Sequence, residues 1–187
     1  MKITMLLLMT LLFACAHKRP EFELQSTPEN YAWYIRTTIK AKARRVSGFP
    51  LKQFNSNWCA ANALRIQDFP APLRQYLRED FTNQLAEVGG RVGFSMDVPF
   101  GKNGPDHVRV GVFHDCKNGK RGTFVYATKN GVLLDSIEFM PSSFAVLSNS
   151  KDGLIWQECF SCDVMVRLNW NWEQQKFGVR QSLIPQE

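Results

Sequence analysis

The five cysteines are the residues of this sequence whose chemistry and spacing are most informative. Cys59 and Cys116 are isolated, Cys159 and Cys162 form a Cys-Phe-Ser-Cys motif, and Cys15 ends an apolar N-terminal segment. A Cys-x-x-Cys pair supports redox catalysis when it begins a helix, and it binds zinc when a second such pair completes the site. Here the motif lies between strand-like segments, and the sequence contains no second Cys-x-x-Cys. We therefore expect structural disulfides at these positions.

Four cysteines remain once Cys15 is set aside, and four cysteines allow three connectivities. Cys116 ends a predicted strand and Cys59 lies in the predicted helical half, so neither has a partner nearby in the sequence. We favour Cys59–Cys116 together with Cys159–Cys162. The alternative pairs each cysteine of the motif with one distant cysteine. A Cys59–Cys116 bond closes a long loop and is expected to stabilise the fold by about 4 kcal/mol.

Cys59 is also a candidate nucleophile. Gln53 precedes it by six residues, and His107 and His114 lie downstream. The spacing of Gln and Cys is similar to that of papain-like cysteine hydrolases, in which the Gln serves the oxyanion hole. The resemblance implies hydrolysis of a cell-wall peptide or protein, with one of the two histidines as the base. We keep this as the alternative, because a catalytic Cys59 leaves three cysteines unpaired in an oxidising compartment.

The loop over residues 96–106 places oxygen-bearing side chains among glycines directly before a Val-rich strand. Asp97, Asn103 and Asp106 are the side chains in it that suit a hard cation such as Ca²⁺. This loop and the order of predicted elements resemble single-domain bacterial envelope proteins that carry one FG-GAP-like segment. The resemblance implies a Ca²⁺ site, but Pro99 and Lys102 stand where acidic or amide ligands are expected. We expect a surface loop without a metal, with Ca²⁺ as the alternative.

The first fifteen residues predict where the protein is located. Residues 3–13 are apolar apart from two threonines, which is too short for a bilayer core that needs about 20 apolar residues. The segment ends in Leu12-Phe13-Ala14-Cys15, which resembles the lipobox of bacterial lipoproteins. That resemblance implies cleavage after Ala14, acylation of Cys15 and stable membrane attachment. The residue directly after Cys15 is Ala16 rather than an Asp, and this implies sorting to the outer membrane. The alternative is cleavage by ordinary signal peptidase, which releases a soluble periplasmic protein.

Composition favours a folded domain and argues against a nucleic-acid partner. The chain has 187 residues and a formal net charge of +6. Its length and its 14 phenylalanines suffice to form a hydrophobic core. The basic residues are spread out, with one cluster over residues 40–45, whereas a nucleic-acid interface concentrates them on one face. We expect the membrane to be a partner through the N-terminal lipid, and an envelope protein or cell-wall polymer to be a further partner.

Periodicity predicts helices first and strands later. Helical spacing predicts a helix over residues 26–46, a short one over 57–66, and the clearest one from Pro70-Ala71-Pro72 to Gly89-Gly90. From Val108 onward the period is two, and Asn118-Gly119 and Asn130-Gly131 predict hairpin turns. We expect an α+β fold, with two or three N-terminal helices packed on an antiparallel β-meander of about six strands. The predicted organisation is a signal peptide over 1–14, a tether over 15–25 and one α+β domain over 26–187.

These patterns predict a location rather than a reaction. The sequence contains no Gly-x-Ser-x-Gly, phosphate loop or paired-carboxylate pattern. We expect a lipid-anchored protein of the bacterial cell envelope, on the periplasmic face of the outer membrane. Its expected role is non-catalytic binding or structural support without a cofactor, and the alternative is the papain-like hydrolase.

Overall fold

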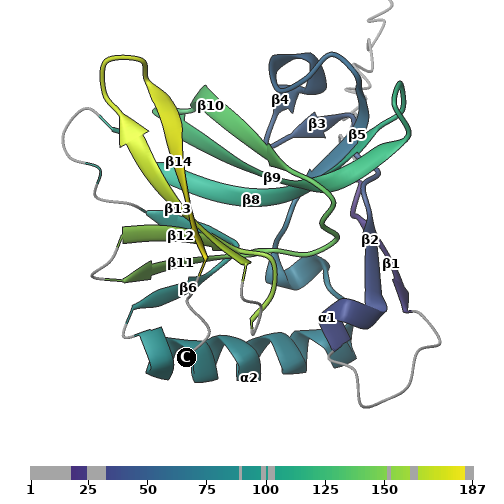
Figure 1. The fold of residues 1–187 in the computed structure, drawn as a ribbon. Helices are drawn as coiled ribbons and strands as arrows, with labels where there is room; N and C mark the ends of the chain where they lie inside the picture. Colours follow the sequence, from purple (N-terminus) through teal and green to yellow (C-terminus); the bar gives the residue numbers. More distant parts are fainter. Residues whose placement is uncertain are drawn as a thin grey trace, which may run out of the picture.

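The structure is a computed structural model that describes residues 18–24, 33–88, 90–97, 100, 104–150, 153–160 and 164–183. Within these residues the chain is mostly β (Figure 1). Two five-stranded antiparallel sheets form its body, and two small two-stranded ribbons lie in the N-terminal part. One helix, α2 (Ala71–Val88), is longer than a single turn.

The first sheet is built around β8, which is hydrogen-bonded along both edges. Its strand order is β10-β9-β8-β5, and β7 also pairs with β8. Strand β9 runs along one edge, while β5 and β7 share the other edge. The strands are β5 (Trp58–Ala63), β7 (Ser95–Asp97), β8 (His107–Asp115), β9 (Lys120–Lys129) and β10 (Val132–Phe139). The predicted turns at Asn118-Gly119 and Asn130-Gly131 join β8 to β9 and β9 to β10, where Asn130 and Gly131 both have positive φ.

The second sheet has the strand order β14-β13-β12-β11-β6. Its strands are β6 (Arg91–Gly93), β11 (Val146–Ser150), β12 (Gly153–Gln157), β13 (Val164–Asn171) and β14 (Lys176–Leu183). Helix α2 runs beside β6, the edge strand of this sheet (Figure 1). Leu77 of α2 is fully buried and Phe81 packs against the core, whereas Tyr76 is half-exposed.

Two contacts join the sheets at their edges. Strands β6 and β7 are consecutive and pair with different sheets, and the carbonyl of Phe94 between them accepts a hydrogen bond of 2.9 Å from the Val110 N–H. At the other edge, Asp135 follows an irregularity in β10, and its Oδ2 accepts a 2.8 Å hydrogen bond from the Phe177 N–H of β14. The two sheets therefore enclose a core between them.

Both faces of the first sheet are buried. Val108, Val110 and Val112 alternate along β8 into the main core between the sheets. Phe113 of β8 and Phe124 of β9 lie in a second cluster on the opposite face. The segment 46–58 covers that face, so most of β8 and β9 is buried on both sides, although polar residues such as Arg109 alternate with the apolar ones.

The N-terminal part consists of short elements. They are β1 (Glu21–Leu24), α1 (Trp33–Arg36), β2 (Thr37–Lys40), β3 (Arg45–Val46), β4 (Phe49–Pro50) and the 3₁₀ turns η1 (Leu51–Gln53) and η2 (Ile66–Asp68). Strand β1 lies inside the segment 15–25 assigned to the tether and pairs with β2. Ion pairs of 2.5 Å, Lys40 with Glu23 and Lys42 with Glu21, accompany this pairing.

The predicted fold class, two or three N-terminal helices on a six-strand meander, is wrong. In the described part of the segment predicted as a helix over 26–46, which begins at residue 33, the single turn α1 is followed by two strands, and residues 57–66 contain β5 instead of a helix. Alanine-rich β5 is extended because tertiary pairing with β8 outweighs its helix propensity. Asn62 secures it, since its side chain accepts from the Lys42 and Ala43 N–H groups and donates to the Lys18 carbonyl. The predicted meander is also divided between two sheets.

Candidate functional site

A cavity of about 580 Å³ opens where η2, α2, the β6–β7 junction and β8 come together. This volume is within the range of small-molecule sites, which is about 300–1,000 Å³. Its apolar wall is formed by Ala63, Leu64, Ile66, Phe81, Val92 and Phe94. Its polar groups come from Ser47, Arg65, Gln67, Ser95 and Arg109. Apolar and polar residues therefore contribute comparably to its lining, and a concave site of this size with convergent polar groups is a candidate for an organic ligand.

Arg109 is one of the polar residues that line the cavity, and sheet register places it there. It lies directly opposite Ser95 of β7 and Tyr126 of β9, so the three side chains form a row across one face of the sheet. Its Nε donates to the Ser95 hydroxyl at 3.4 Å. Among the described residues, no carboxylate forms an ion pair with Arg109.

Tyr126 fixes the hydroxyl of Ser47 at the cavity. Tyr126 is fully buried, and its hydroxyl lies 2.7 Å from the Ser47 Oγ. Burial raises the pKa of the Tyr126 phenol, while the Ser47 hydrogen bond and the charges of Arg109 and Arg65 act in the opposite direction. The phenol is consequently neutral at physiological pH and remains a hydrogen-bond donor. Ser47 reaches this position because it has positive φ in the turn between β3 and β4.

Arg65, the second guanidinium of the cavity, is held in place by Asp68. Its Nε and Nη2 donate to the two carboxylate oxygens of Asp68 at 2.8 and 2.9 Å. These hydrogen bonds raise the pKa of Arg65, and the Asp68 side chain is almost completely buried. Because Asp68 compensates this charge, Arg65 orients and polarises the site, whereas Arg109 supplies the uncompensated charge.

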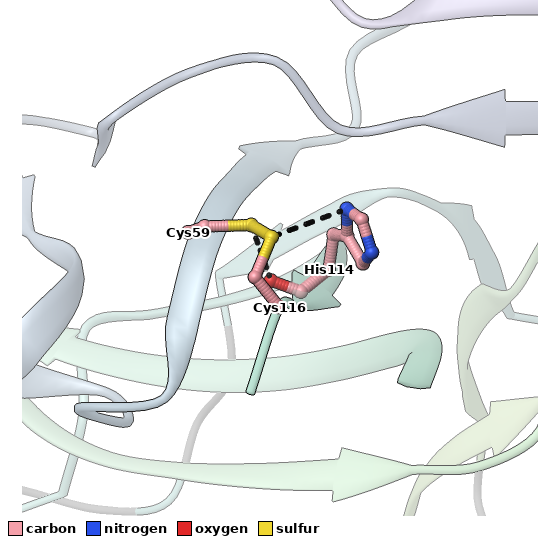
Figure 2. A group of neighbouring side chains, drawn as sticks. All are labelled: Cys59, His114 and Cys116. Carbon is pink, nitrogen blue, oxygen red and sulfur yellow. Dashed lines mark hydrogen bonds between the residues drawn. A yellow bond between two sulfur atoms is a disulfide. The ribbon is translucent and has the colours of Figure 1, made fainter. Parts of the chain in front are cut away.

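A second group of chemically active side chains lies at the far end of β8. Cys59 and Cys116 form a disulfide, the pairing that the sequence analysis favours, and the His114 ring lies beside it (Figure 2). The Cys116 Sγ is 3.8 Å from His114 Nδ1, and the Cys59 Sγ is 3.5 Å from the His114 carbonyl oxygen. Cys59 and His114 are half-buried, and Cys116 is exposed. The three possible ligand atoms lie within 4.8 Å of one another.

The β8–β9 turn fixes the position of Cys116. The Asp115 carboxylate accepts hydrogen bonds from the Lys117 and Asn118 N–H groups, both at 3.0 Å, and from the Asn118 side chain at 2.7 Å. These bonds, the Asn118 side chain first, lower the pKa of Asp115. On the neighbouring strand, the register of β5 shifts between Trp58 and Ala60, which places Cys59 at the irregularity opposite the turn.

The residues of the predicted papain-like site do not form a catalytic site in the structure. Cys59 is half of a disulfide and so has no thiolate, which is the nucleophilic form of cysteine. Gln53 is exposed in η1. His114 is beside Cys59, but His107 begins β8, about 23 Å away along the strand at about 3.3 Å per residue. His107 instead pairs with Asp97, whose Oδ1 is 2.5 Å from its Nδ1.

The residues of the predicted calcium loop have other partners. Asp97 bonds His107, and Asp106 accepts a 2.8 Å hydrogen bond from the Asn130 N–H in the β9–β10 turn. Asn103 lies outside the described residues. Within the described part of the chain, Cys59, His114 and Cys116 are the one group with the composition and spacing of a metal site.

Two of the predicted site cysteines, Cys15 and Cys162, lie outside the described residues. Cys159 is itself disulfide-bonded and buried, and its predicted pairing with Cys162 remains a prediction. Acylation of Cys15 likewise remains a prediction. Of the helices in the described ranges, none has both the length and the apolar character needed to span a membrane.

Sequence reasoning did not identify the cavity residues Arg65 and Arg109. The one local signal was Arg109 itself, a charged residue alternating with the buried valines of β8. Neither a known protein family nor a curated protein nor a solved structure matches this chain. The function therefore has to be inferred from the geometry of the site.

Proposed function

We propose that this protein is a lipid-anchored lipoprotein of the bacterial cell envelope whose β domain is a non-catalytic binding module. The ligand we propose is an organic anion, a carboxylate or phosphate carried on an apolar body, held in the cavity between α2 and β8. The observation that carries this proposal is Arg109, a guanidinium without a carboxylate partner among the described residues, set beside an apolar wall.

The polar groups of the cavity match one end of such a ligand. The guanidinium of Arg109 presents planar donors suited to a carboxylate or phosphate, and the hydroxyls of Ser47 and Ser95 add neutral donors. Phe81 and Phe94 offer apolar surface to the remainder of the ligand. A non-catalytic role is favoured because Cys59, the candidate nucleophile, is disulfide-bonded.

Binding is tested with an anionic fluorescent amphiphile, anilinonaphthalene sulfonate, and its displacement by unlabelled fatty acid and alkyl phosphate. Replacing Arg109 by Gln removes one charge-assisted interaction of about 1.5–3 kcal/mol and is expected to weaken binding by about 10- to 150-fold. The control is Arg167→Gln, which removes an exposed arginine from β13. Equal affinity of the two variants, or equal displacement by an uncharged alkyl alcohol, contradicts an anion site centred on Arg109.

The envelope location rests on the lipobox resemblance at Leu12-Phe13-Ala14-Cys15 and is tested separately. Intact mass of the mature protein is expected to correspond to residues 15–187 plus acyl chains. Cys15→Ala is expected to abolish acylation and membrane retention. An unacylated N-terminus at His17, or recovery of the protein in the inner-membrane fraction, contradicts the proposed anchoring or sorting respectively.

A further inference from the structure

We propose that the disulfide between Cys59 and Cys116 is a redox-controlled metal site, which binds Zn²⁺ through both sulfurs and His114 when it is reduced. This site is distinct from the Arg109 cavity, and the proposal is independent of the ligand bound there. In the oxidised state the disulfide joins two strands. In the reduced state the same side chains would form a three-residue zinc site with one open position.

The end of β8 brings the three donors together. His114 lies near the end of β8, and Cys116 directly follows that strand at the start of the β8–β9 turn, with its Sγ 3.8 Å from His114 Nδ1. Cys59 reaches them from the adjacent strand β5, as Figure 2 shows. Two thiolates and one imidazole are the donors that zinc prefers, and they leave a fourth tetrahedral position for water or a further ligand.

The distances already approach those of a zinc site. With Zn–S of about 2.3 Å and Zn–N of about 2.0–2.1 Å, tetrahedral ligands lie about 3.5–3.8 Å apart. The Cys116 Sγ is 3.8 Å from His114 Nδ1, which requires almost no movement. The two sulfurs must separate from bonding distance to about 3.8 Å, which a change of side-chain rotamer can provide. All three ligand atoms already lie within 4.8 Å of one another, so the remaining adjustment is about 1 Å.

Contacts other than the disulfide also hold the backbone around the site. Strand β8 is hydrogen-bonded to β9 from His107 to Asp115 and to β5 over residues 111–115. The turn hydrogen bonds of Asp115 hold Cys116, and Trp58 stacks on Phe113 with ring centroids 4.4 Å apart. We therefore expect both cysteines to keep their relative positions after reduction.

Reduction of the Cys59–Cys116 disulfide requires an external reductant, and we propose a dithiol. Because Cys116 is exposed, its sulfur is open to attack by an external thiolate through a mixed disulfide. The dithiol transfers two electrons and two protons, so that Cys59 and Cys116 become thiols and the dithiol becomes a disulfide. Zn²⁺ then displaces both thiol protons to solvent, and the resulting site with two thiolates is electrically neutral.

The test uses the full-length protein in detergent, both oxidised and reduced with a phosphine that is then removed under anaerobic conditions. Zn²⁺ is added, and alkylation of each cysteine is followed by peptide mass spectrometry. Zn²⁺ is expected to slow the alkylation of Cys59 and Cys116 at least about tenfold, because the metal-bound thiolate is protected. The oxidised protein is expected to bind no Zn²⁺ at this site.

The decisive variant is His114→Ala, compared with His107→Ala at the other end of the same strand. Loss of a ligand is expected to weaken Zn²⁺ affinity by about tenfold or more, while His107→Ala retains full affinity. Near-ultraviolet circular dichroism reports whether the reduced protein stays folded. Loss of that signal on reduction, unchanged alkylation rates with Zn²⁺, or full protection in His114→Ala would each overturn the proposal.

Discussion

Replacing Gly111 by Ala tests the packing of β8, the strand that carries both sites. A Cβ at this position would lie 2.5 Å from the Asn62 carbonyl oxygen and 2.5 Å from Cε1 of Phe124, whereas ordinary contact begins at 3.4 Å. The Asn62 carbonyl belongs to the backbone of β5, which the sheet and the disulfide with Cys116 hold against β8. Close to 1 Å of displacement is therefore needed on both sides of the strand.

Overpacking a well-packed core costs about 1–3 kcal/mol, and clashes with backbone and ring together favour the upper end. We expect Gly111→Ala to lower the free energy of unfolding by about 3 kcal/mol, which lowers Tm by about 6–12 °C in a domain of this size. The measurement is denaturant unfolding at equilibrium, with the slope m checked for unchanged two-state behaviour.

Gly178→Ala in β14 is the matched control. Its Cβ would lie 3.9 Å from the nearest backbone oxygen, and its φ is not in the left-handed region. This substitution is expected to change stability by less than about 1 kcal/mol, in the stabilising direction if at all. If Gly111→Ala is as stable as Gly178→Ala, the close packing of β5 and β9 against β8 at this glycine is refuted.

Two further predictions concern the core and the buried tyrosine that holds Ser47. Leu77→Ala in α2 is expected to lower the free energy of unfolding by about 2–5 kcal/mol, because the side chain is fully buried. Tyr76→Ala at the half-exposed neighbouring position is expected to lower it much less. Equal decreases for the two variants in urea unfolding would contradict the orientation of α2. Burial raises the pKa of Tyr126 above its ordinary value of 10.0, so the unfolded chain releases this proton at a lower pH than the folded one, and stability falls as pH rises above about 10. Tyr126→Phe is expected to remove this component, and an unchanged pH slope in the variant would contradict it.

Local signals in the sequence determined the elements whose structure depends on neighbouring residues. Asn118-Gly119 and Asn130-Gly131 predicted hairpins because these pairs favour the turn conformations that join twisted strands. The helix following Pro70 was predicted from its start and stop residues, and the structure contains it as α2. The pairing of Cys59 with Cys116 followed from counting cysteines and separating the local pair from the distant ones.

The extended conformation of β5 and the division of the strands into two sheets depend on long-range pairing, so they were decided by the tertiary structure. The alanines of β5 favour a helix in isolation, but the strand is extended because β8 offers it hydrogen bonds and Asn62 anchors it to the segment at residues 42–43. The division of the meander into two sheets depends on edge contacts such as Asp135 with the Phe177 N–H, between residues 42 positions apart. No local pattern in the sequence encodes such a contact.

Both candidate sites depend on strand register for the same reason. Ser95, Arg109 and Tyr126 meet because β7, β8 and β9 pair in one register, and a shift of one residue would turn Arg109 to the opposite face. The sequence by itself determined the types of these residues, the local turns and α2. The tertiary structure decided the strand register, which places Arg109 at the cavity and His114 beside the disulfide. Register depends on packing against both faces of the first sheet, because burial of both faces fixes which side chains point each way.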